Sequence, residues 1–352
     1  MRRAMVVAGV DALLVTHLPD VRWLSGFTGS NAAVALTARK AALFTDGRYT
    51  TQARHETRGA RVVIAKKSAL RECCALLGES AKRAWFDPQH TAVADLPLMR
   101  AGVSGQKSRG FFVALRQPLV SALRMVKDEG ELRLMTEAAA LGCTLFEELL
   151  PRIEIGKTEV ALAAELEFAA RRRGAAGMSF ETIIASGPRS ALPHGHATEA
   201  KLPRKGFVTL DFGVILNGYC SDMTRTVHVG GAHREEHAAY EAVLEAQEAA
   251  INAVKPGATC GDVDKAARDV LKKAGFGKFF THSTGHGVGL EIHELPRVAA
   301  GQQTRLEPGM VITIEPGVYL PGKFGIRIED MVAVTKTGHR ILTPVTKGWI
   351  EL

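Results

Sequence analysis

The chain has 352 residues, of which 46% are hydrophobic and 23% charged, which is the composition of a globular protein long enough for two domains. Its net charge is +8, but the 45 basic residues are spread along the chain among 37 acidic ones, so no basic patch predicts a nucleic-acid partner. The apolar runs are all shorter than the ~18 residues that a membrane span needs.

The first third of the sequence predicts an α/β domain. Apolar runs such as residues 10–17 and 61–67 have the length of strands, and segments of helical character such as residues 70–80 alternate with them. The N-terminal stretch is expected to begin a strand of this fold and not a signal peptide, because Gly9 and Asp11 interrupt its apolar run.

A change of composition separates this domain from the rest of the chain. Residues 102–117 are rich in Gly, Ser and Arg, and a helical pattern begins near Lys127. We therefore expect a boundary between residues 117 and 127, with domains at residues 1–120 and 121–352. In the second domain, amphipathic helical segments alternate with strands that carry acidic side chains.

Two of these acidic side chains lie on the arms of a predicted β-hairpin. Asn217-Gly218 stands between apolar, β-branched runs and suits a type I′ turn, whose central residues both need positive φ. With this turn Thr224 lies opposite Asp211, so Asp211 and Asp222 are diagonal neighbours on one face, about 7–8 Å apart. The two carboxylates can then converge on a metal ion, whereas a loop of different parity would separate them.

Three further candidate ligands lie nearer the C-terminus. His286 follows in HSTGHGVGLEIHE, Glu315 ends an alternating strand before Pro-Gly, and Glu329 shares a strand face with Arg327. Four carboxylates and one imidazole cost several kcal/mol per unpaired charge to bury unless cations compensate. A pair of divalent ions (Mn²⁺, Co²⁺ or Zn²⁺) does so and can activate one water. The sequence therefore predicts a metal-dependent hydrolase.

The cysteines indicate a reducing environment. They form no CxxC pair and no zinc-type spacing, and their number is odd, which favours reduced thiols and a cytoplasmic location. The cysteines are Cys73, Cys74, Cys143, Cys220 and Cys260.

The motifs around the candidate ligands resemble those of the pita-bread metallopeptidases, the family of Xaa-Pro aminopeptidase, Xaa-Pro dipeptidase (prolidase), methionine aminopeptidase and creatinase. PHGHA, DFG-x8-DMTRT, STGHGVGLEIHE, TIEPGVY and GIRIED occur in this order across most of residues 127–352. LSGFTGSNA and TDGRY are similar to the N-terminal domain of the proline-specific branch, which methionine aminopeptidases usually lack. The resemblance implies an α/β creatinase-like N-terminal domain followed by an α+β pita-bread catalytic domain.

The resemblance also implies two divalent metal ions held by the five candidate ligands. Asp222 and Glu329 would bridge the ions, Asp211 would bind the first ion, and His286 and Glu315 the second. Manganese is expected, with cobalt and zinc as alternatives. Glu315 would also shuttle the proton of the water that lies between the ions and acts as nucleophile.

Further residues match positions that contact substrate in the family. His194, His293 and Arg327 match catalytic positions, where a cation can stabilise a developing oxyanion. His282 matches a position near the substrate, although an isolated histidine is more often structural.

The proline pocket is predicted from three side chains. Phe180 and Ile292 resemble the apolar wall for the proline ring, and the alternative is that both belong to the core. Arg297 matches a prolidase position that can pair with a substrate carboxylate, a task that suits a bidentate guanidinium.

The motifs are compatible with two subtypes of proline-specific peptidase. The N-terminal motifs favour an Xaa-Pro aminopeptidase, and Xaa-Pro dipeptidase is the alternative because FETIIASGPRSALPHG and HELPR also occur in short prolidases. A creatinase-like hydrolase and a metal-free binding protein on the same fold are further hypotheses, which the full ligand set disfavours. We expect a homodimer that acts on Xaa-Pro peptides and binds neither nucleic acid nor membrane.

Overall fold

The structure is a computed structural model, and it describes residues 1–103, 105 and 109–352. The chain divides into two compact units, Met1–Arg124 and Met125–Leu352, whereas the ranges expected from the sequence meet at residue 120. Among the described helices, none is both long enough and apolar enough to cross a membrane.

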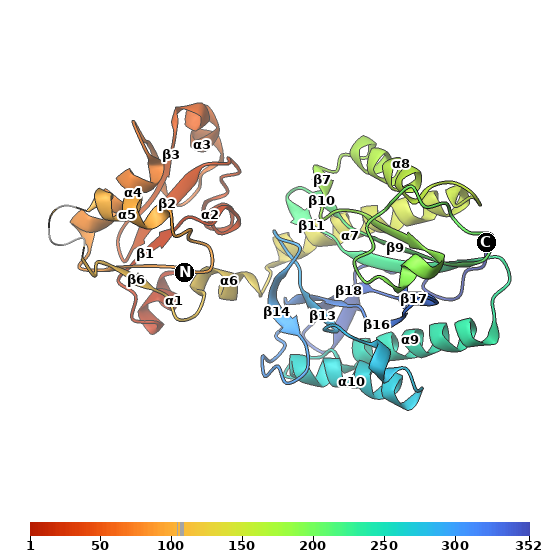
Figure 1. Ribbon diagram of the computed structural model, residues 1–352. Helices are drawn as coiled ribbons and strands as arrows, with labels where there is room; N and C mark the ends of the chain where they lie inside the picture. Colours follow the sequence, from red (N-terminus) through yellow and green to blue (C-terminus); the bar gives the residue numbers. More distant parts are fainter. Residues whose placement is uncertain (104, 106–108) are drawn as a thin grey trace. The chain divides into compact units, whose positions relative to one another are not determined.

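The described residues of the first unit form one six-stranded mixed sheet with the order β4-β3-β2-β1-β5-β6 (Figure 1). The strands are β1 (Ala12–Val15), β2 (Ala32–Thr37), β3 (Ala41–Thr45), β4 (Arg61–Ile64), β5 (Ala84–Phe86) and β6 (Phe112–Ala114). The helices are α1 (Arg2–Val7), α2 (Leu18–Ser25), α3 (Thr50–Glu56), α4 (Ala69–Ser80), α5 (Asp95–Gly102) and α6 (Leu119–Arg124). The predicted α/β character of this domain is confirmed.

Both faces of this sheet are buried by hydrophobic cores. Successive side chains of a strand point to opposite faces, so each strand contributes to both cores. Along β1, Leu13 and Val15 join a core with Val21 of α2, whereas Ala12 and Leu14 join a second core with Leu77 of α4.

The expectation that the N-terminal stretch begins a strand is wrong for its first residues. Arg2–Val7 form helix α1, and Gly9, with φ of 66°, ends this segment before β1 starts at Ala12. A short apolar run without alternation fits a helix as well as a strand, so the pattern alone did not distinguish them.

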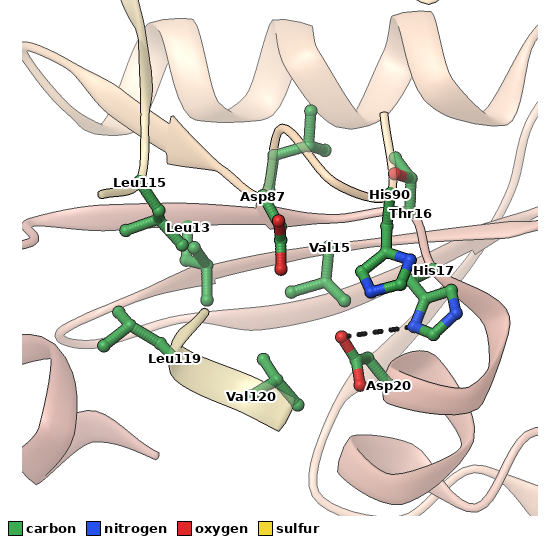
Figure 2. A pocket seen from close by; sticks show the side chains of 11 residues that line it. Leu13, Val15, Thr16, His17, Asp20, Asp87, His90, Leu115, Leu119 and Val120 are labelled. Atoms are coloured by element: carbon green, nitrogen blue, oxygen red, sulfur yellow. Dashed lines mark ion pairs between the residues drawn. The ribbon is translucent and has the colours of Figure 1, made fainter. Parts of the chain in front are cut away.

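A small polar cluster closes the end of this sheet near α2 and α6 (Figure 2). The rings of His17 and His90 stack with centroids 3.7 Å apart, and the buried carboxylate of Asp20 lies 2.6 Å from a guanidinium nitrogen of Arg124. The cavity between these groups and Asp87 measures about 10 Å³, which is room for about one water molecule. The ion pair between Asp20 and Arg124 therefore joins α2 to α6 beside this end of the sheet.

In the second unit, which is described throughout, strands lie between two pairs of helices (Figure 1). Its helices are α7 (Glu129–Leu149), α8 (Glu159–Arg172), α9 (Arg234–Ala253) and α10 (Cys260–Lys273). The strands of its first half are β7 (Gly177–Met178), β8 (Ile183–Ser186), β9 (Gly206–Phe212), β10 (Val214–Leu216), β11 (Tyr219–Cys220) and β12 (Met223–Val229). Those of its second half are β13 (Gly285–Gly287), β14 (Glu294–Val298), β15 (Val311–Ile314), β16 (Gly317–Leu320), β17 (Phe324–Arg327), β18 (Asp330–Val334) and β19 (His339–Ile341).

The strands pair into small antiparallel sheets, with orders β11-β10-β7, β12-β9-β8, β14-β13-β15-β18-β19 and β16-β17. Along β9, Val208, Leu210 and Phe212 pack into a core with α7 and α8. Thr209 and Asp211 point to the opposite face by the period of two. This alternation turns polar side chains of β9 towards the space between the two helix pairs.

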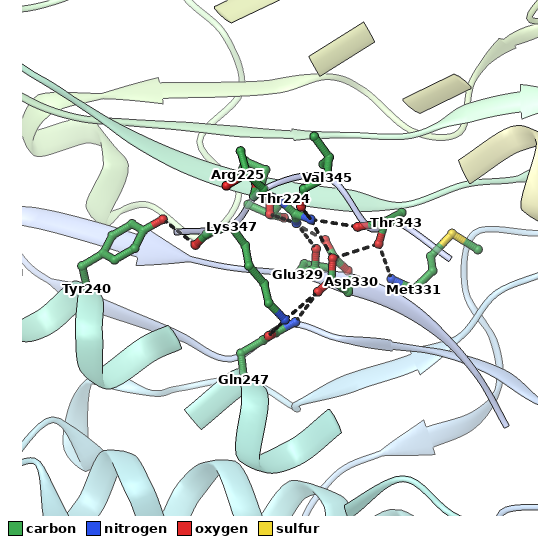
Figure 3. A network of polar contacts seen from close by, with 11 residues as sticks. Thr224, Arg225, Tyr240, Gln247, Glu329, Asp330, Met331, Thr343, Val345 and Lys347 are labelled. Carbon is green, nitrogen blue, oxygen red and sulfur yellow. Dashed lines mark hydrogen bonds and ion pairs between the residues drawn. The ribbon is translucent and has the colours of Figure 1, made fainter. Parts of the chain in front are cut away.

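A buried arginine joins the strands behind this polar face (Figure 3). Arg225 of β12 lies 2.7 Å from Asp330 of β18, with side chains 2% and 1% exposed, and donates hydrogen bonds to the carbonyls of Glu329, Thr343 and Val345. Burial raises the pKa of Asp330, but Arg225 and Lys347 outweigh it and lower that pKa. The network thus neutralises a buried carboxylate while it fixes the backbone of Glu329.

Replacing Arg225 with methionine should destabilise the second unit by about 3–5 kcal/mol, because Asp330 and several carbonyls lose a buried partner. Urea unfolding of the protein in excess chelator measures this loss without a contribution from metal. Lys323→Ala is the control, since Lys323 pairs with Glu235 at the surface and should cost about 0–1 kcal/mol. Equal losses of unfolding free energy in the two variants would contradict the role of Arg225 as the buried partner of Asp330.

Candidate metal centre

The hairpin that carries the two aspartates has the predicted register. Asn217 and Gly218 adopt φ of 52° and 84°, and β10 pairs with β11 across these two residues. Thr224 of β12 lies directly opposite Asp211 of β9. Asp222, just before β12, is therefore on the same face as Asp211, as the sequence predicts.

The other three candidate ligands come from neighbouring strands of the second half. His286 is in β13, and Glu315 directly follows β15. Glu329 lies between β17 and β18 and donates its backbone N–H to Thr224 of β12, over 3.1 Å. Because Ile314 pairs with Asp330, the residues after β15 and before β18 meet at one end of the sheet.

These elements bring the candidate ligands together. Donor atoms of Asp222, His286 and Glu329 lie within 4.8 Å of one another. The Nε2 atom of His286 is 3.6 Å from Asp222 Oδ2 and 3.5 Å from Glu315 Oε1. Asp211 joins the group through Arg327, whose Nη2 donates to Asp211 Oδ2 over 2.5 Å.

The acidic side chains carry more negative charge than their surroundings balance. Burial raises the pKa of Asp222 and of Glu329 well above the usual range, and the neighbouring carboxylates raise both pKa values further. Burial also raises the pKa of Glu315 to about 7, although Arg327 opposes this shift. Acids that resist ionisation because they are buried close together are stabilised as carboxylates by a nearby cation, so this group suits positively charged ligands.

Two local features fit these residues to metal ions. Asp211 Oδ1 is buried and has no hydrogen-bond partner among the described residues, so a lone pair there is free for a ligand bond. His286 Nδ1 lies 3.0 Å from the Gly287 carbonyl and must carry the proton that it donates, which leaves Nε2 as an unprotonated donor facing the carboxylates. Burial lowers the pKa of His286 to about 4 and keeps the ring neutral. The residues present therefore fit a centre for divalent ions.

A hydrogen-bonded chain extends from the carboxylates to His282. Arg327 donates to Thr224 over 3.1 Å and to the Tyr319 hydroxyl over 2.7 Å, and that hydroxyl lies 2.9 Å from His282 Nε2. Since the His282 Nδ1 proton goes to the carbonyl of Ser283, Tyr319 donates to Nε2. Thr224 in turn donates to Glu329 over 2.7 Å.

Tyr319 and Thr224 were not predicted as site residues. The sequence could have indicated both residues, since Thr224 lies opposite Asp211 in the predicted hairpin and Tyr319 is an even number of residues after Glu315 in EPGVY.

A buried acid of α10 supports the strand that carries His286. Asp264 is fully buried and accepts hydrogen bonds from Arg268 and from the backbone N–H and hydroxyl of Thr284. These bonds fix the segment that leads into β13.

His194 and His293 lie at the edge of this group. The rings of His286 and His293 meet edge to face at 4.4 Å. Burial, followed by the charge of His194, lowers the pKa of His293, and burial lowers the pKa of His282 to about 4. The carbonyl of Pro193, next to His194, accepts a hydrogen bond from Arg327.

The strand that follows His293 is held by a buried ion pair. Glu294 lies 3.2 Å from Lys127, with side chains 6% and 1% exposed, and accepts the backbone N–H of Glu291.

The proposed substrate pocket residues have different surroundings. Arg297 of β14 is exposed and lies directly opposite His286 in the register, so the two side chains share one face. Ile292 is partly buried against a cluster that includes Val288 and Met331. Phe180 is half-buried and follows β7, and its role in the pocket stays a prediction.

Two family descriptions match this chain. Metallopeptidase family M24 matches residues 133–336, and the creatinase/prolidase N-terminal domain matches residues 1–126. Both agree with the two-domain resemblance found in the sequence.

Relatives that match this chain over nearly its whole length are also peptidases of this two-domain type. The chain is 38% identical to an uncharacterized peptidase of Bacillus subtilis, YqhT, over 98% of this chain and 96% of that one. The structure matches an Xaa-Pro dipeptidase from Bacillus anthracis with a TM-score of 0.95 and 38% identity, covering 100% and 98% of the two chains. It also matches an X-Pro aminopeptidase from Thermotoga maritima with a TM-score of 0.89 and 35% identity, covering 99% and 100%. With its N-terminal creatinase-type domain and its pita-bread second unit, the chain belongs to metallopeptidase family M24.

Proposed function

We propose that the protein is an Xaa-Pro dipeptidase that uses two divalent metal ions. The observation that carries this proposal is the convergence of three buried carboxylates and the half-buried Glu315 with one neutral imidazole, whose lone pair faces them. The subtype is supported by the Bacillus anthracis dipeptidase, which is more similar to this chain than the Thermotoga maritima aminopeptidase.

The choice of subtype differs from the expectation drawn from LSGFTGSNA and TDGRY. Those motifs belong to the N-terminal domain, which the dipeptidase and the aminopeptidase relatives share with this chain over nearly their full lengths. They therefore distinguish this branch from methionine aminopeptidase but do not distinguish its two subtypes. Xaa-Pro aminopeptidase becomes the second candidate.

The residues that would hold the ions are those predicted from the sequence. Asp222, Glu329 and His286 have donor atoms within 4.8 Å of one another, Glu315 lies 3.5 Å from His286, and these four residues with Asp211 would together hold the two ions. When bound, the ions supply Lewis acidity and lower the pKa of water towards neutrality. Manganese, with only one nitrogen donor among oxygens, is the proposed metal.

The chain's own groups would then bind and orient the peptide. Glu315 is placed to accept and return a proton, since it lies beside His286 at the end of β15. His194 and His293 lie at the accessible edge, where they can donate to the carbonyl oxygen as negative charge develops on it. Arg327 is engaged by Asp211, Thr224 and Tyr319, so its part is to hold this framework and to add positive charge near it.

We propose that residues of β14 determine which peptide lengths are accepted. A dipeptide ends in a carboxylate next to the scissile bond, and Arg297 lies exposed on the face of His286, where it can pair with that charge. Ile292 and Phe180 are proposed to line the proline ring. A homodimer in the cytoplasm and the absence of a nucleic-acid partner remain predictions.

Replacing Glu329 with alanine should weaken binding of at least one ion and abolish turnover, because the variant removes a shared carboxylate between two cations. Elemental analysis after dialysis against Mn²⁺ measures occupancy, and hydrolysis of Ala-Pro measures turnover. Asp269→Ala removes an exposed acid of α10 and should change neither. Two bound ions with a near-normal rate would show that Glu329 is not a ligand.

Exhaustive chelation of the native protein should also abolish the hydrolysis of Ala-Pro, because the proposed mechanism needs the metal ions.

His293→Ala should lower kcat by about 10²–10³-fold while both ions stay bound, which is the usual loss for one donor to an oxyanion. The exposed His55 in the first unit provides the control, and His55→Ala should keep full activity. If His293→Ala instead loses metal, His293 is a ligand and the proposed set of five is incomplete.

The subtype is tested with Ala-Pro, Ala-Pro-Gly and a longer Xaa-Pro peptide, each with Mn²⁺, Co²⁺ or Zn²⁺ and analysed by mass spectrometry. A dipeptidase should cleave only Ala-Pro. Arg297→Ala should lower kcat/KM for Ala-Pro by about 10–100-fold, the value of a hydrogen bond to a charged group, whereas Arg172→Ala on α8 should not. Cleavage of the longer peptides after residue one would move the assignment to Xaa-Pro aminopeptidase.

A further inference from the structure

The segment that carries His194 connects β8 to β9 and has little regular structure of its own. Apart from a short 3-10 turn at Gly187–Ala191, residues 187–200 form turns and extended backbone. His194 itself is exposed, so its own packing cannot fix its position. The segment must be held by groups elsewhere in the fold if His194 is to meet a substrate in one geometry.

Both ends of the segment meet at Glu159, the first residue of α8. Its carboxylate accepts hydrogen bonds from the backbone N–H and hydroxyl of Ser186, over 2.8 and 2.9 Å. On the other side it accepts from the backbone N–H and hydroxyl of Thr198, over 3.1 and 2.9 Å. Arg189 lies between them, with Nε 3.1 Å from Glu159 Oε2. One side chain thus closes the segment into a loop.

The backbone of α8 adds to this closure. The N–H groups in the first turn of a helix have no partner within the helix. Here Glu159 N–H donates to the Ala200 carbonyl over 2.9 Å, and Val160 N–H donates to the Thr198 carbonyl over 3.0 Å. The positive end of the helix dipole also favours a carboxylate at this position.

The middle of the loop is attached to the metal centre. Ser190 Oγ accepts the backbone N–H of Gly325 over 2.8 Å, and the Pro193 carbonyl accepts from Arg327 over 3.1 Å. A Cβ atom at Gly325 would lie 2.1 Å from the Ser190 carbonyl oxygen, so only glycine allows the loop to approach β17 this closely. His194 follows Pro193 and is therefore presented next to Arg327.

Glu159 is completely buried, so it cannot touch a substrate, and every described donor to it belongs to the His194 loop. We propose that Glu159 is a positioning residue, which closes the loop of residues 186–200 and thereby holds His194 in place for catalysis. The inference rests on the proposed function only in the role that it gives His194.

Glu159→Gln tests this proposal with little change of volume. The amide retains one acceptor oxygen but turns an NH2 group towards the donors of either Ser186 or Thr198, so one end of the loop is released. We expect kcat/KM for Ala-Pro to fall by about 10²-fold, the order expected for a misplacement of about 1 Å, with both ions still bound. In a His194→Ala background the same substitution should change the rate by no more than about 2-fold.

Controls separate positioning from general stability. Glu165→Gln makes the same change on α8 at a residue that pairs with Lys157 and Arg152, and it should leave the rate unchanged. Thr198→Val removes the hydroxyl that donates to Glu159 and accepts the backbone N–H of Ala200, but it keeps the Thr198 N–H bond to Glu159. It should show a smaller loss with the same dependence on His194, which covers the case that Glu159→Gln folds poorly. Equal losses with and without His194 would overturn the proposal, as would full activity of His194→Ala.

Hydrogen–deuterium exchange gives a readout that does not depend on peptidase activity. In Glu159→Gln, amides of residues 186–200 should exchange faster, while those of β9 and β12 keep the native rate. Unchanged exchange in the loop would overturn the proposal even if the protein proves to act on other substrates. Failure of the native protein to cleave any Xaa-Pro peptide would instead contradict the proposed function.

Discussion

The second unit depends on the negative charge that is gathered at its centre. Asp211, Asp222, Glu315 and Glu329 are gathered by strands of both halves, and among the described residues Arg327 is the cation that donates to one of them. Burial and the neighbouring carboxylates raise the pKa values of Asp222, Glu315 and Glu329, so their ionised forms are costly unless cations lie beside them. Divalent ions reverse this balance, since they satisfy the carboxylates together. The hydrophobic cores on either side, under α7–α8 and α9–α10, supply the rigidity that keeps such groups together.

Each half of the second unit uses a buried acid of a helix to hold a segment of the site. Glu159 of α8 gathers the loop that bears His194, and Asp264 of α10 gathers Thr284 beside His282 and His286. In both cases the carboxylate accepts a backbone N–H together with a threonine hydroxyl, and an arginine balances its charge. Side chains that never reach the substrate can therefore determine where the accessible ones lie, because irregular segments have few contacts of their own.

The sequence was most informative where spacing alone decides the geometry. The Asn217-Gly218 turn determines that Thr224 faces Asp211, and the structure has this register. The motifs likewise identified the fold of both domains. Spacing could not show that Tyr319 connects Arg327 to His282, because the contact between Tyr319 and His282 joins strand β16 to a segment 37 residues earlier. It also missed helix α1, whose short apolar run has no period. It did not separate the two peptidase subtypes, since the N-terminal motifs lie in a domain that relatives of both subtypes share.

The ion pair between Lys127 and Glu294 bears on where the catalytic part of this protein begins. The match to family M24 starts at residue 133, yet Lys127 lies before it, as does the capping box of Asp128 and Glu131 at the start of α7. A fragment trimmed to the matched region would retain all five proposed ligands but would remove the cation beside the buried carboxylate of Glu294, the neighbour of His293. A catalytic fragment should therefore begin no later than Lys127, because a boundary taken from sequence similarity alone would remove part of the site's support.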